Sequence, residues 1–220
     1  MYITNMSTWN ILVVDTSASM TSNIDSVNKG IVDLFVEQKD NIDRFTFLTF
    51  NTDIHCAIDR HFNEIECETV IKYIVNKGLT ALYDAVGHVY EMIISGCAEN
   101  VNVTIITDGF ENSSKIHTLA SLKTLRETID KMCNITVTFI CENKNIMDNN
   151  TAIISHANES CEVSGDYSLA FRVASRTMSG ILPPSRCMNY ISDENNVSVS
   201  EPIVKRQTTY DSKKKPRLFF

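Results

Sequence analysis

The chain of 220 residues is 43% apolar and 21% charged, a composition typical of globular proteins, and it is long enough for one α/β domain with a tail. Its net charge of −7 is unevenly spread, because residues 185–220 have a net charge of +3 and residues 1–184 a net charge of −10. The acidic body argues against nucleic acid as the main partner, because binding to phosphates needs a basic surface. No apolar run reaches the roughly 18 residues of a membrane span, and residues 1–9 lack the basic and apolar regions of a signal peptide, so we expect neither segment.

The first predicted element is a strand that runs into polar residues. Apolar residues 11–14 lead into Asp15, and the hydroxyls of Ser17 and Ser19 follow at alternate positions. A short unbroken apolar run is typical of a strand buried on both faces of a parallel sheet. Ligands in open α/β sheets bind at the carboxyl ends of the strands, so these oxygen-bearing side chains are candidates for holding a hard cation.

Strands and helices continue along the chain to about residue 182. Segments rich in β-branched and aromatic residues predict strands, and one connection is short enough that the two strands it joins must be antiparallel. Apolar residues at helical spacing predict helices. After the first strand, the predicted strands are residues 43–50, 54–58, 101–107, 135–141 and 160–163. The predicted helices are residues 24–35, 65–77, 82–96, 119–132, 151–157 and 170–181.

This order of elements predicts a doubly wound α/β fold in three layers, with helices on both faces of a mostly parallel six-stranded sheet. The antiparallel strand, residues 54–58, is expected at an edge of the sheet. Pro183 and Pro184 close the domain, which gives a folded unit over residues 1–184 and a flexible polar tail over residues 185–220.

Two further polar residues lie where a strand or turn ends and the next element begins. Thr80 follows the turn residue Gly78, and Asp108 follows a buried strand. Taken singly, Thr80, Ser17 and Ser19 could each be a helix cap. Asp84 is expected to be a solvated helix residue that supports Thr80 by a hydrogen bond.

Together, Asp15-x-Ser17-x-Ser19, Thr80 and Asp108 resemble the von Willebrand factor A (vWA) family, over residues 9–182. That family's metal-ion-dependent adhesion site has the same residue types in the same order. The resemblance implies that Ser17 and Ser19 bind Mg²⁺, or alternatively Mn²⁺, through their hydroxyls, and that Thr80 binds it directly or through water. It implies that Asp15 and Asp108 act mostly through water. Leu79 departs from the family, in which glycine is frequent at that position.

The resemblance implies a non-enzymatic interaction domain, an adaptor or assembly subunit. The scattered cysteines favour the cytoplasm, and the basic cluster near the C-terminus leaves the nucleus as an alternative. Neutral hydroxyls leave much of the charge of Mg²⁺ uncompensated, so an open coordination position would attract an Asp or Glu side chain of a protein partner. One alternative is a structural component of a large assembly, in which the metal braces the loops. The other is a metal-dependent phosphatase or hydrolase. Ser17 disfavours it, because haloacid-dehalogenase-like phosphatases have an aspartate at that position that acts as the general acid.

The remaining unusual residues carry weaker predictions. Seven cysteines without a C-x-x-C pair indicate reduced thiols, and five histidines without zinc spacing indicate ordinary surface or half-buried side chains. The basic and aromatic C-terminus, residues 213–220, is either a solvated tail, a short motif that docks onto a partner, or a nuclear-targeting signal.

Overall fold

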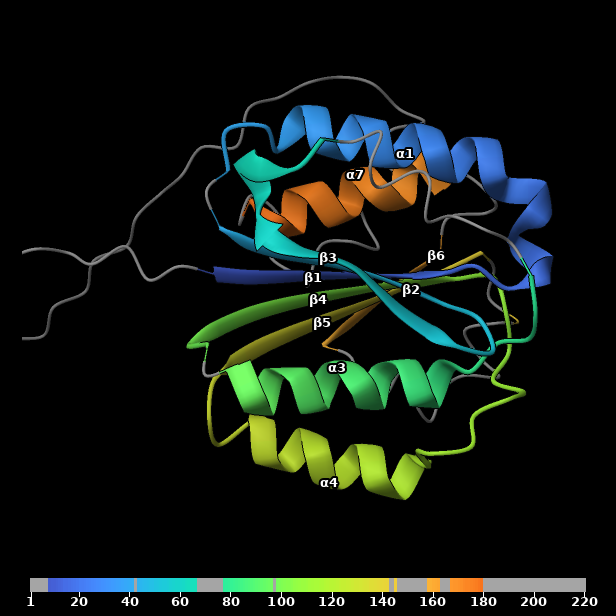
Figure 1. Ribbon diagram of the computed structural model, residues 1–220, viewed down its shortest axis with the longest axis vertical. Helices are drawn as coiled ribbons and strands as arrows, with labels where there is room; N and C mark the ends of the chain where they lie inside the picture. The colour runs from blue at the N-terminus through green and yellow to red at the C-terminus, as the bar shows by residue number, and fades with distance from the viewer. Residues whose placement is uncertain are drawn as a thin grey trace, which may run out of the picture.

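In the computed structural model, the described residues are 8–41, 43–66, 77–96, 98–142, 145, 158–162 and 167–179. They form an α/β fold around a sheet with the strand order β3-β2-β1-β4-β5-β6 (Figure 1). The strands are β1 (Thr8–Asp15), β2 (Arg44–Phe50), β3 (Ile54–His61), β4 (Asn100–Thr107), β5 (Asn134–Cys141) and β6 (Glu159–Glu162). The helices are α1 (Ile24–Glu37), α3 (Leu82–Gly96), α4 (Leu119–Ile129) and α7 (Tyr167–Met178), with short 3-10 helices η1 (Ala18–Asn23) and η2 (Phe62–Glu64).

The sheet is parallel except at one edge. β1 pairs in parallel with both β2 and β4, and β4, β5 and β6 continue the parallel order. Among the described strands, β3 pairs with β2, antiparallel, and lies at the edge of the sheet. The predicted α/β class and the mostly parallel sheet with one antiparallel edge strand are therefore confirmed.

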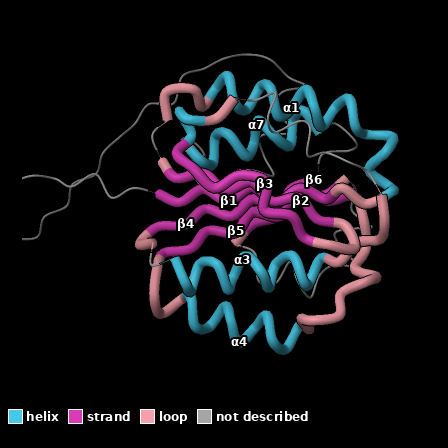
Figure 2. The backbone as a smooth tube through the Cα atoms, viewed as in Figure 1, coloured by secondary structure: helices cyan, strands magenta, loops and turns pink. Residues whose placement is uncertain are grey.

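Helices lie on both sides of the sheet. Figure 2 shows α1 and α7 on one side and α3 and α4 on the other. The residues of β1 divide between these sides, because Leu12 and Val14 belong to the apolar cluster with α1 and α7, whereas Ile11 and Val13 belong to the cluster with α3. β1 is thus buried on both faces, which is why an unbroken apolar run encodes it.

Several boundaries differ from those predicted. β3 extends to His61 because it pairs with the whole length of β2, with a register shift between Phe47 and Leu48. α4 ends at Ile129, and Met132 lies in the turn into β5 with 48% of its surface exposed. A 3-10 helix that the sequence did not predict, η1, separates β1 from α1.

Other predictions fall on residues that the structure does not describe. The helices predicted over residues 65–77 and 151–157 lie wholly or mostly outside the described residues, as do the boundary at Pro183 and Pro184 and the tail over residues 185–220. Within the described part of the chain, no helix combines the length and the apolar character needed to cross a membrane.

Candidate metal centre

The candidate residues lie at the carboxyl ends of two neighbouring central strands. Asp15 is the last residue of β1, and Asp108 directly follows β4. These strands run in parallel register, with Val14 opposite Ile106, so both ends reach the same edge of the sheet. The topology that the sequence predicted therefore brings two carboxylates, distant along the chain, to one place.

Hydrogen bonds orient the carboxylate of Asp15. Thr107 donates its hydroxyl to Asp15 Oδ2 at 2.5 Å, and the backbone N–H of Ser17 donates to Asp15 Oδ1 at 2.7 Å. Each carboxylate oxygen thus has a donor, which fixes the direction of the side chain. The second bond also folds the chain back after β1, so the Ser17 side chain lies beside the end of the strand.

A second chain of hydrogen bonds joins the two serines to Asp108. The hydroxyl oxygens of Ser17 and Ser19 lie 3.0 Å apart, and Ser19 donates its hydroxyl to Asp108 Oδ1 at 2.6 Å. These contacts connect the start of η1 with the residue that follows β4. The D-x-S-x-S segment and Asp108 therefore form one polar cluster.

Thr80 reaches the same cluster through Gly109. A Cβ atom at Gly109 would lie 2.7 Å from Thr80 Oγ1 and 3.4 Å from Asp15 Oδ2, so both oxygen atoms converge on the space beside this glycine. The Thr80 side chain is only 2% exposed. The structure thus brings together all five predicted site residues.

Burial makes the two carboxylates costly to ionise. Asp15 is 1% exposed, and desolvation raises its pKa to about 6 despite the hydrogen bonds from Thr107 and Ser17. Burial also raises the pKa of Asp108, and the negative charge of Glu142 adds to that shift. A divalent cation among these groups would stabilise their ionised forms.

The donor set fits a hard cation. It consists of two carboxylates and three hydroxyls, and Mg²⁺, Mn²⁺ and Ca²⁺ prefer oxygen ligands of this kind. In the described part of the chain, no three His, Cys, Asp or Glu residues are grouped to hold a metal ion, so hydroxyls would have to complete this site. Ser19 is exposed, and a cation beside it would be accessible from solvent.

Comparisons with known proteins agree on the fold. No family model matches the chain, and no curated protein matches it. Solved structures do, including the von Willebrand factor type A protein from Catenulispora acidiphila, with 10% identity, a TM-score of 0.57 and coverage of 78% of this chain and 43% of the other. The vWF domain of the type V pili tip protein Mfa5 from Porphyromonas gingivalis is 9% identical, with a TM-score of 0.61 and coverage of 81% and 97%.

The PilB minor pilin from Streptococcus sanguinis is 12% identical, with a TM-score of 0.60 and coverage of 83% of this chain and 64% of the pilin. The fold is vWA-like. At these identities the likeness concerns the fold alone, and the chain spans less than two thirds of the length of the proteins from Catenulispora acidiphila and Streptococcus sanguinis.

The vWA-like domain also contains a site residue that the sequence did not reveal. Asn112, in the loop between β4 and α4, accepts the Thr80 N–H on its Oδ1 at 2.9 Å, and its own N–H donates to the Thr80 carbonyl oxygen at 3.1 Å. This pair holds the backbone of Thr80 against the β4–α4 loop. No local pattern marks Asn112, because its partner lies 32 residues earlier in the chain.

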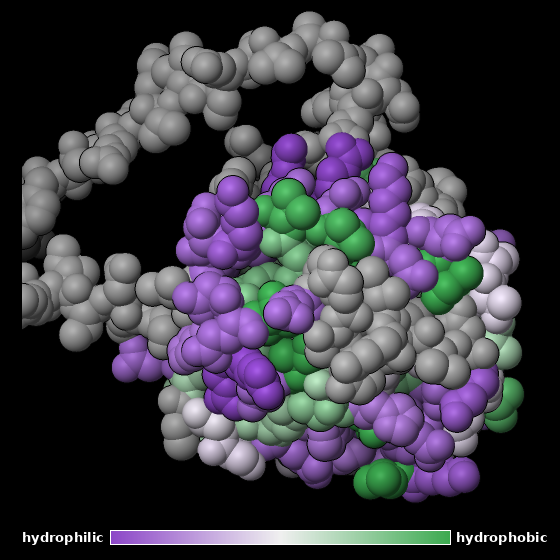
Figure 3. All heavy atoms as spheres, turned by 45° about the horizontal axis from the view of Figure 1, so that its top comes forward, coloured by the Kyte–Doolittle hydropathy of each residue, from purple (hydrophilic) through white to green (hydrophobic). Residues whose placement is uncertain are grey.

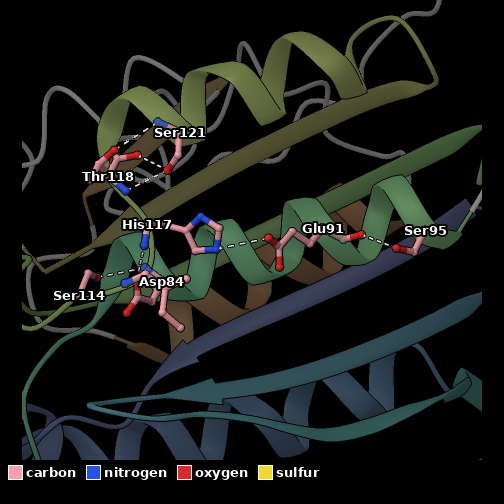
Figure 4. Close-up of polar contacts among 8 residues, drawn as sticks. Asp84, Glu91, Ser95, Ser114, His117, Thr118 and Ser121 are labelled. Carbon is pink, nitrogen blue, oxygen red and sulfur yellow. Dashed lines mark hydrogen bonds and ion pairs between the residues drawn. The ribbon is translucent and has the colours of Figure 1, made fainter.

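The prediction for Asp84 is wrong. This residue is only 7% exposed, and its carboxylate accepts the backbone N–H groups of Lys115, Ile116 and His117 at 2.8, 2.9 and 2.7 Å. Figure 4 shows Asp84 beside His117. It therefore anchors the β4–α4 loop rather than the side chain of Thr80. Its place in the first turn of α3 also favours a negative charge, because the helix dipole is positive there.

Glu111 holds the same loop from within. Its Oε1 accepts the N–H groups of Ser113 and Ser114, and its Oε2 accepts the Ser114 hydroxyl at 2.7 Å and the Tyr83 N–H at 2.8 Å. His117, expected like the other histidines to be an ordinary surface or half-buried side chain, lies with Nε2 3.7 Å from Glu91 Oε1 (Figure 4). In this vWA-like fold, the carboxylates of Asp84 and Glu111 thus hold the β4–α4 loop in place.

Proposed function

We propose that this chain is a non-enzymatic protein-interaction domain that binds Mg²⁺, or Mn²⁺ in its place, through a complete metal-ion-dependent adhesion site. Ser17, Ser19 and Thr80 would supply hydroxyl ligands, with Asp15 and Asp108 as adjacent anions that act mostly through water. The bound cation would hold an Asp or Glu side chain of a protein partner. One observation carries the proposal, namely the convergence of all five residues at the ends of β1 and β4.

The hydrogen bonds support neutral ligands nearest the cation. Both oxygens of Asp15 already accept a hydrogen bond, and Asp108 Oδ1 accepts one from Ser19. A hydroxyl group can rotate its hydrogen away and offer a lone pair to a cation. Because the hydroxyl is neutral, it leaves the charge of the cation uncompensated. A cation held in this way would keep a strong attraction for an external carboxylate.

The comparisons support an interaction role. Mfa5 is described as a pili tip protein and PilB as a minor pilin, and both share the vWA-like fold. Such proteins are built into assemblies, which suggests that this chain also acts by protein–protein contact. The fold by itself does not assign the function, so the metal-binding residues carry the proposal.

Metal binding is the first test. We expect titration calorimetry to detect Mg²⁺ and Mn²⁺ binding to the full chain, and Ser19→Ala or Asp108→Asn to weaken it at least tenfold. Ser95→Ala in α3 and Asp25→Asn in α1 are matched controls, because both side chains are exposed and lie outside the site. Unchanged affinity in the two site variants would contradict the proposal.

Carboxylate binding is the second test, and it separates docking from a bracing metal. With Mn²⁺ bound, the relaxation rate of water protons reports the waters on the metal, and we expect millimolar N-acetylglutamate amide to lower it. A rate that stays unchanged while Mn²⁺ remains bound would favour the structural alternative. Mg²⁺-dependent turnover of para-nitrophenyl phosphate that Asp15→Asn abolishes would instead favour a phosphatase.

A further inference from the structure

Large apolar side chains are exposed on both loops of the candidate site. The described residues include five large apolar side chains with high exposure: Val36 at 63%, Leu79 at 55%, Phe110 at 45%, Ile116 at 77% and Met132 at 48%. Polar residues predominate on the described surface shown in Figure 3, where apolar groups are scattered among them. Two of the five adjoin the site, because Leu79 directly precedes Thr80 and Phe110 directly follows Gly109.

A hydrogen bond to a residue distant in the sequence holds Leu79 in this exposed position. Its N–H donates to Thr52 Oγ1 at 3.0 Å. Gly78 before it has a φ of 76°, a left-handed conformation that favours glycine, and a Cβ atom there would lie 2.6 Å from Thr52 Oγ1. The backbone leading into Thr80 is therefore fixed, and Leu79 faces solvent although its apolar surface would gain from burial.

Phe110 is held in a similar way on the second loop. The N–H of Gly109 donates to Thr107 Oγ1 at 3.0 Å, and Asn112 is bonded to Thr80 through both its side chain and its backbone. Phe110 lies between these two fixed points. Its exposed ring is thus presented by an anchored segment of backbone.

The two apolar residues are close enough to meet one short peptide. Thr80 Oγ1 would lie 2.7 Å from a Cβ atom on Gly109. Leu79 and Phe110 are the chain neighbours of Thr80 and Gly109, so each lies one Cα–Cα step further away. Their Cα atoms are therefore within about 14 Å of each other, a distance that about four or five extended residues span. The oxygen cluster lies at the contact between the two loops.

We infer that Leu79 and Phe110 form an apolar rim of the site and select a partner segment in which an Asp or Glu is flanked by large apolar residues. This inference rests on the proposed function, because the acidic residue would be held by the cation. Apolar neighbours on the partner would cover Leu79 and Phe110 and exclude water from the carboxylate–metal contact. Removal of water strengthens such a contact, since the effective dielectric constant falls.

The test uses two fluorescein-labelled peptides, acetyl-Leu-Ala-Glu-Ala-Phe-amide, whose apolar residues lie on the same face of an extended chain as the Glu, and acetyl-Ser-Ser-Glu-Ser-Ser-amide, titrated with the full chain in Mg²⁺ and in EDTA. We expect the first peptide to bind at least tenfold more tightly in Mg²⁺ and to lose binding in EDTA. Leu79→Ser and Phe110→Ser should each raise its Kd about threefold to tenfold. Met132→Ser, at 48% exposure, is the matched control and should leave the Kd unchanged.

The outcomes distinguish failure of the inference from failure of the proposed function. Equal Mg²⁺-dependent binding of the two peptides, or an equal loss in Met132→Ser, would overturn the apolar rim and leave the metal-dependent docking in place. Binding of the first peptide that persists in EDTA would overturn both, because the acidic residue would then not depend on the cation. Binding of neither peptide in Mg²⁺ by a chain that takes up Mg²⁺ would likewise overturn the inference.

Discussion

Thr80 and Asn112 are joined by two hydrogen bonds, one from the Thr80 N–H to Asn112 Oδ1 at 2.9 Å and one from the Asn112 N–H to the Thr80 carbonyl oxygen at 3.1 Å. The pair links the loop before α3 to the loop after β4. The Thr80 hydroxyl is close to the space beside Gly109, so its position depends on both loops. Asn112 therefore acts on the candidate site through Thr80.

We predict that Asn112→Ala weakens Mn²⁺ binding severalfold while changing the unfolding free energy by only about 1 kcal/mol, because one exposed hydrogen-bonding group is lost. Calorimetry gives the first quantity and urea denaturation the second. Asn112→Asp keeps the acceptor oxygen and should retain metal binding. Asn63→Ala, an exposed substitution in η2, is the control. If Asn112→Ala leaves Mn²⁺ affinity at the wild-type value, Asn112 does not position Thr80.

Asp84 is predicted to be a major source of stability for the β4–α4 loop. Asp84→Ala removes the acceptor of three partly buried hydrogen bonds to a charged group, and we expect the unfolding free energy to fall by about 2 to 4 kcal/mol. Asp25→Ala is a matched control, because Asp25 also lies in the first turn of a helix but is exposed. It should cost about 0.5 kcal/mol through the helix dipole.

Urea denaturation measures both variants of this pair, and hydrogen exchange at the amides of residues 115–117 locates the effect. Faster exchange at these amides is expected in Asp84→Ala. Equal losses of stability in the two variants would mean that the helix dipole, rather than the loop hydrogen bonds, accounts for the role of Asp84.

Asp15 should make the stability of the metal-free protein fall as the pH rises. Burial raises its pKa to about 6 in the folded state from an ordinary value of 3.8, so the folded protein holds this proton more tightly than the unfolded chain. The favourable contribution is present below about pH 4 and is lost as the pH rises through about 6, a change of about 3 kcal/mol. The measurement is urea denaturation in EDTA at pH 4, 5, 6 and 7.5 for wild type and Asp15→Asn.

The difference between the two proteins isolates this group, because other titrations cancel. Wild type should lose stability relative to Asp15→Asn with rising pH, and a difference that stays flat would contradict the raised pKa. Adding Mg²⁺ should raise the melting temperature of wild type more at pH 7.5 than at pH 5, since the metal binds the ionised carboxylates.

Arg44 is predicted to stabilise the sheet at the other end of β1. Its guanidinium carbon lies 3.7 Å from the ring centroid of Trp9, and the side chain bonds Asp59 at 2.9 and 2.7 Å. Arg44→Met should lower the unfolding free energy by about 1 kcal/mol, a modest loss because the ion pair is partly exposed. The hydrogen bond from Arg44 lowers the pKa of Asp59, so the contribution of this pair is lost as the pH falls.

Trp9 is the single tryptophan of the chain, so its fluorescence reports this contact directly. We expect the emission maximum of Arg44→Met to move to longer wavelength, because the ring loses the cation that covers it. Arg60→Met, an exposed substitution on β3, is the control and should change neither quantity. An unchanged emission spectrum in Arg44→Met would show that the guanidinium of Arg44 does not shield the ring of Trp9 from solvent.

Local patterns predicted most of the fold that the structure describes. Buried strands such as β1 and β4 carry many apolar residues because they are covered on both faces. β1 ends in Asp15 and β4 is directly followed by Asp108, and both aspartates were recognised as candidate ligands. The polar residues of β2 do not mark an exposed face, since Thr46 and Thr49 are 0% and 1% exposed. Their burial follows from the position of β2 between β1 and β3, which the order of residues does not reveal.

The sequence by itself determined the class of the fold and the five oxygen-bearing residues, because strand ends and residue types are local properties. Only the tertiary structure decided how these residues are supported. Asn112 and Glu111 act on partners 32 and 28 residues away, and Asp84 accepts N–H groups from a loop more than 30 residues later. Such contacts depend on how the loops pack around α3, a long-range relationship that neither periodicity nor spacing encodes.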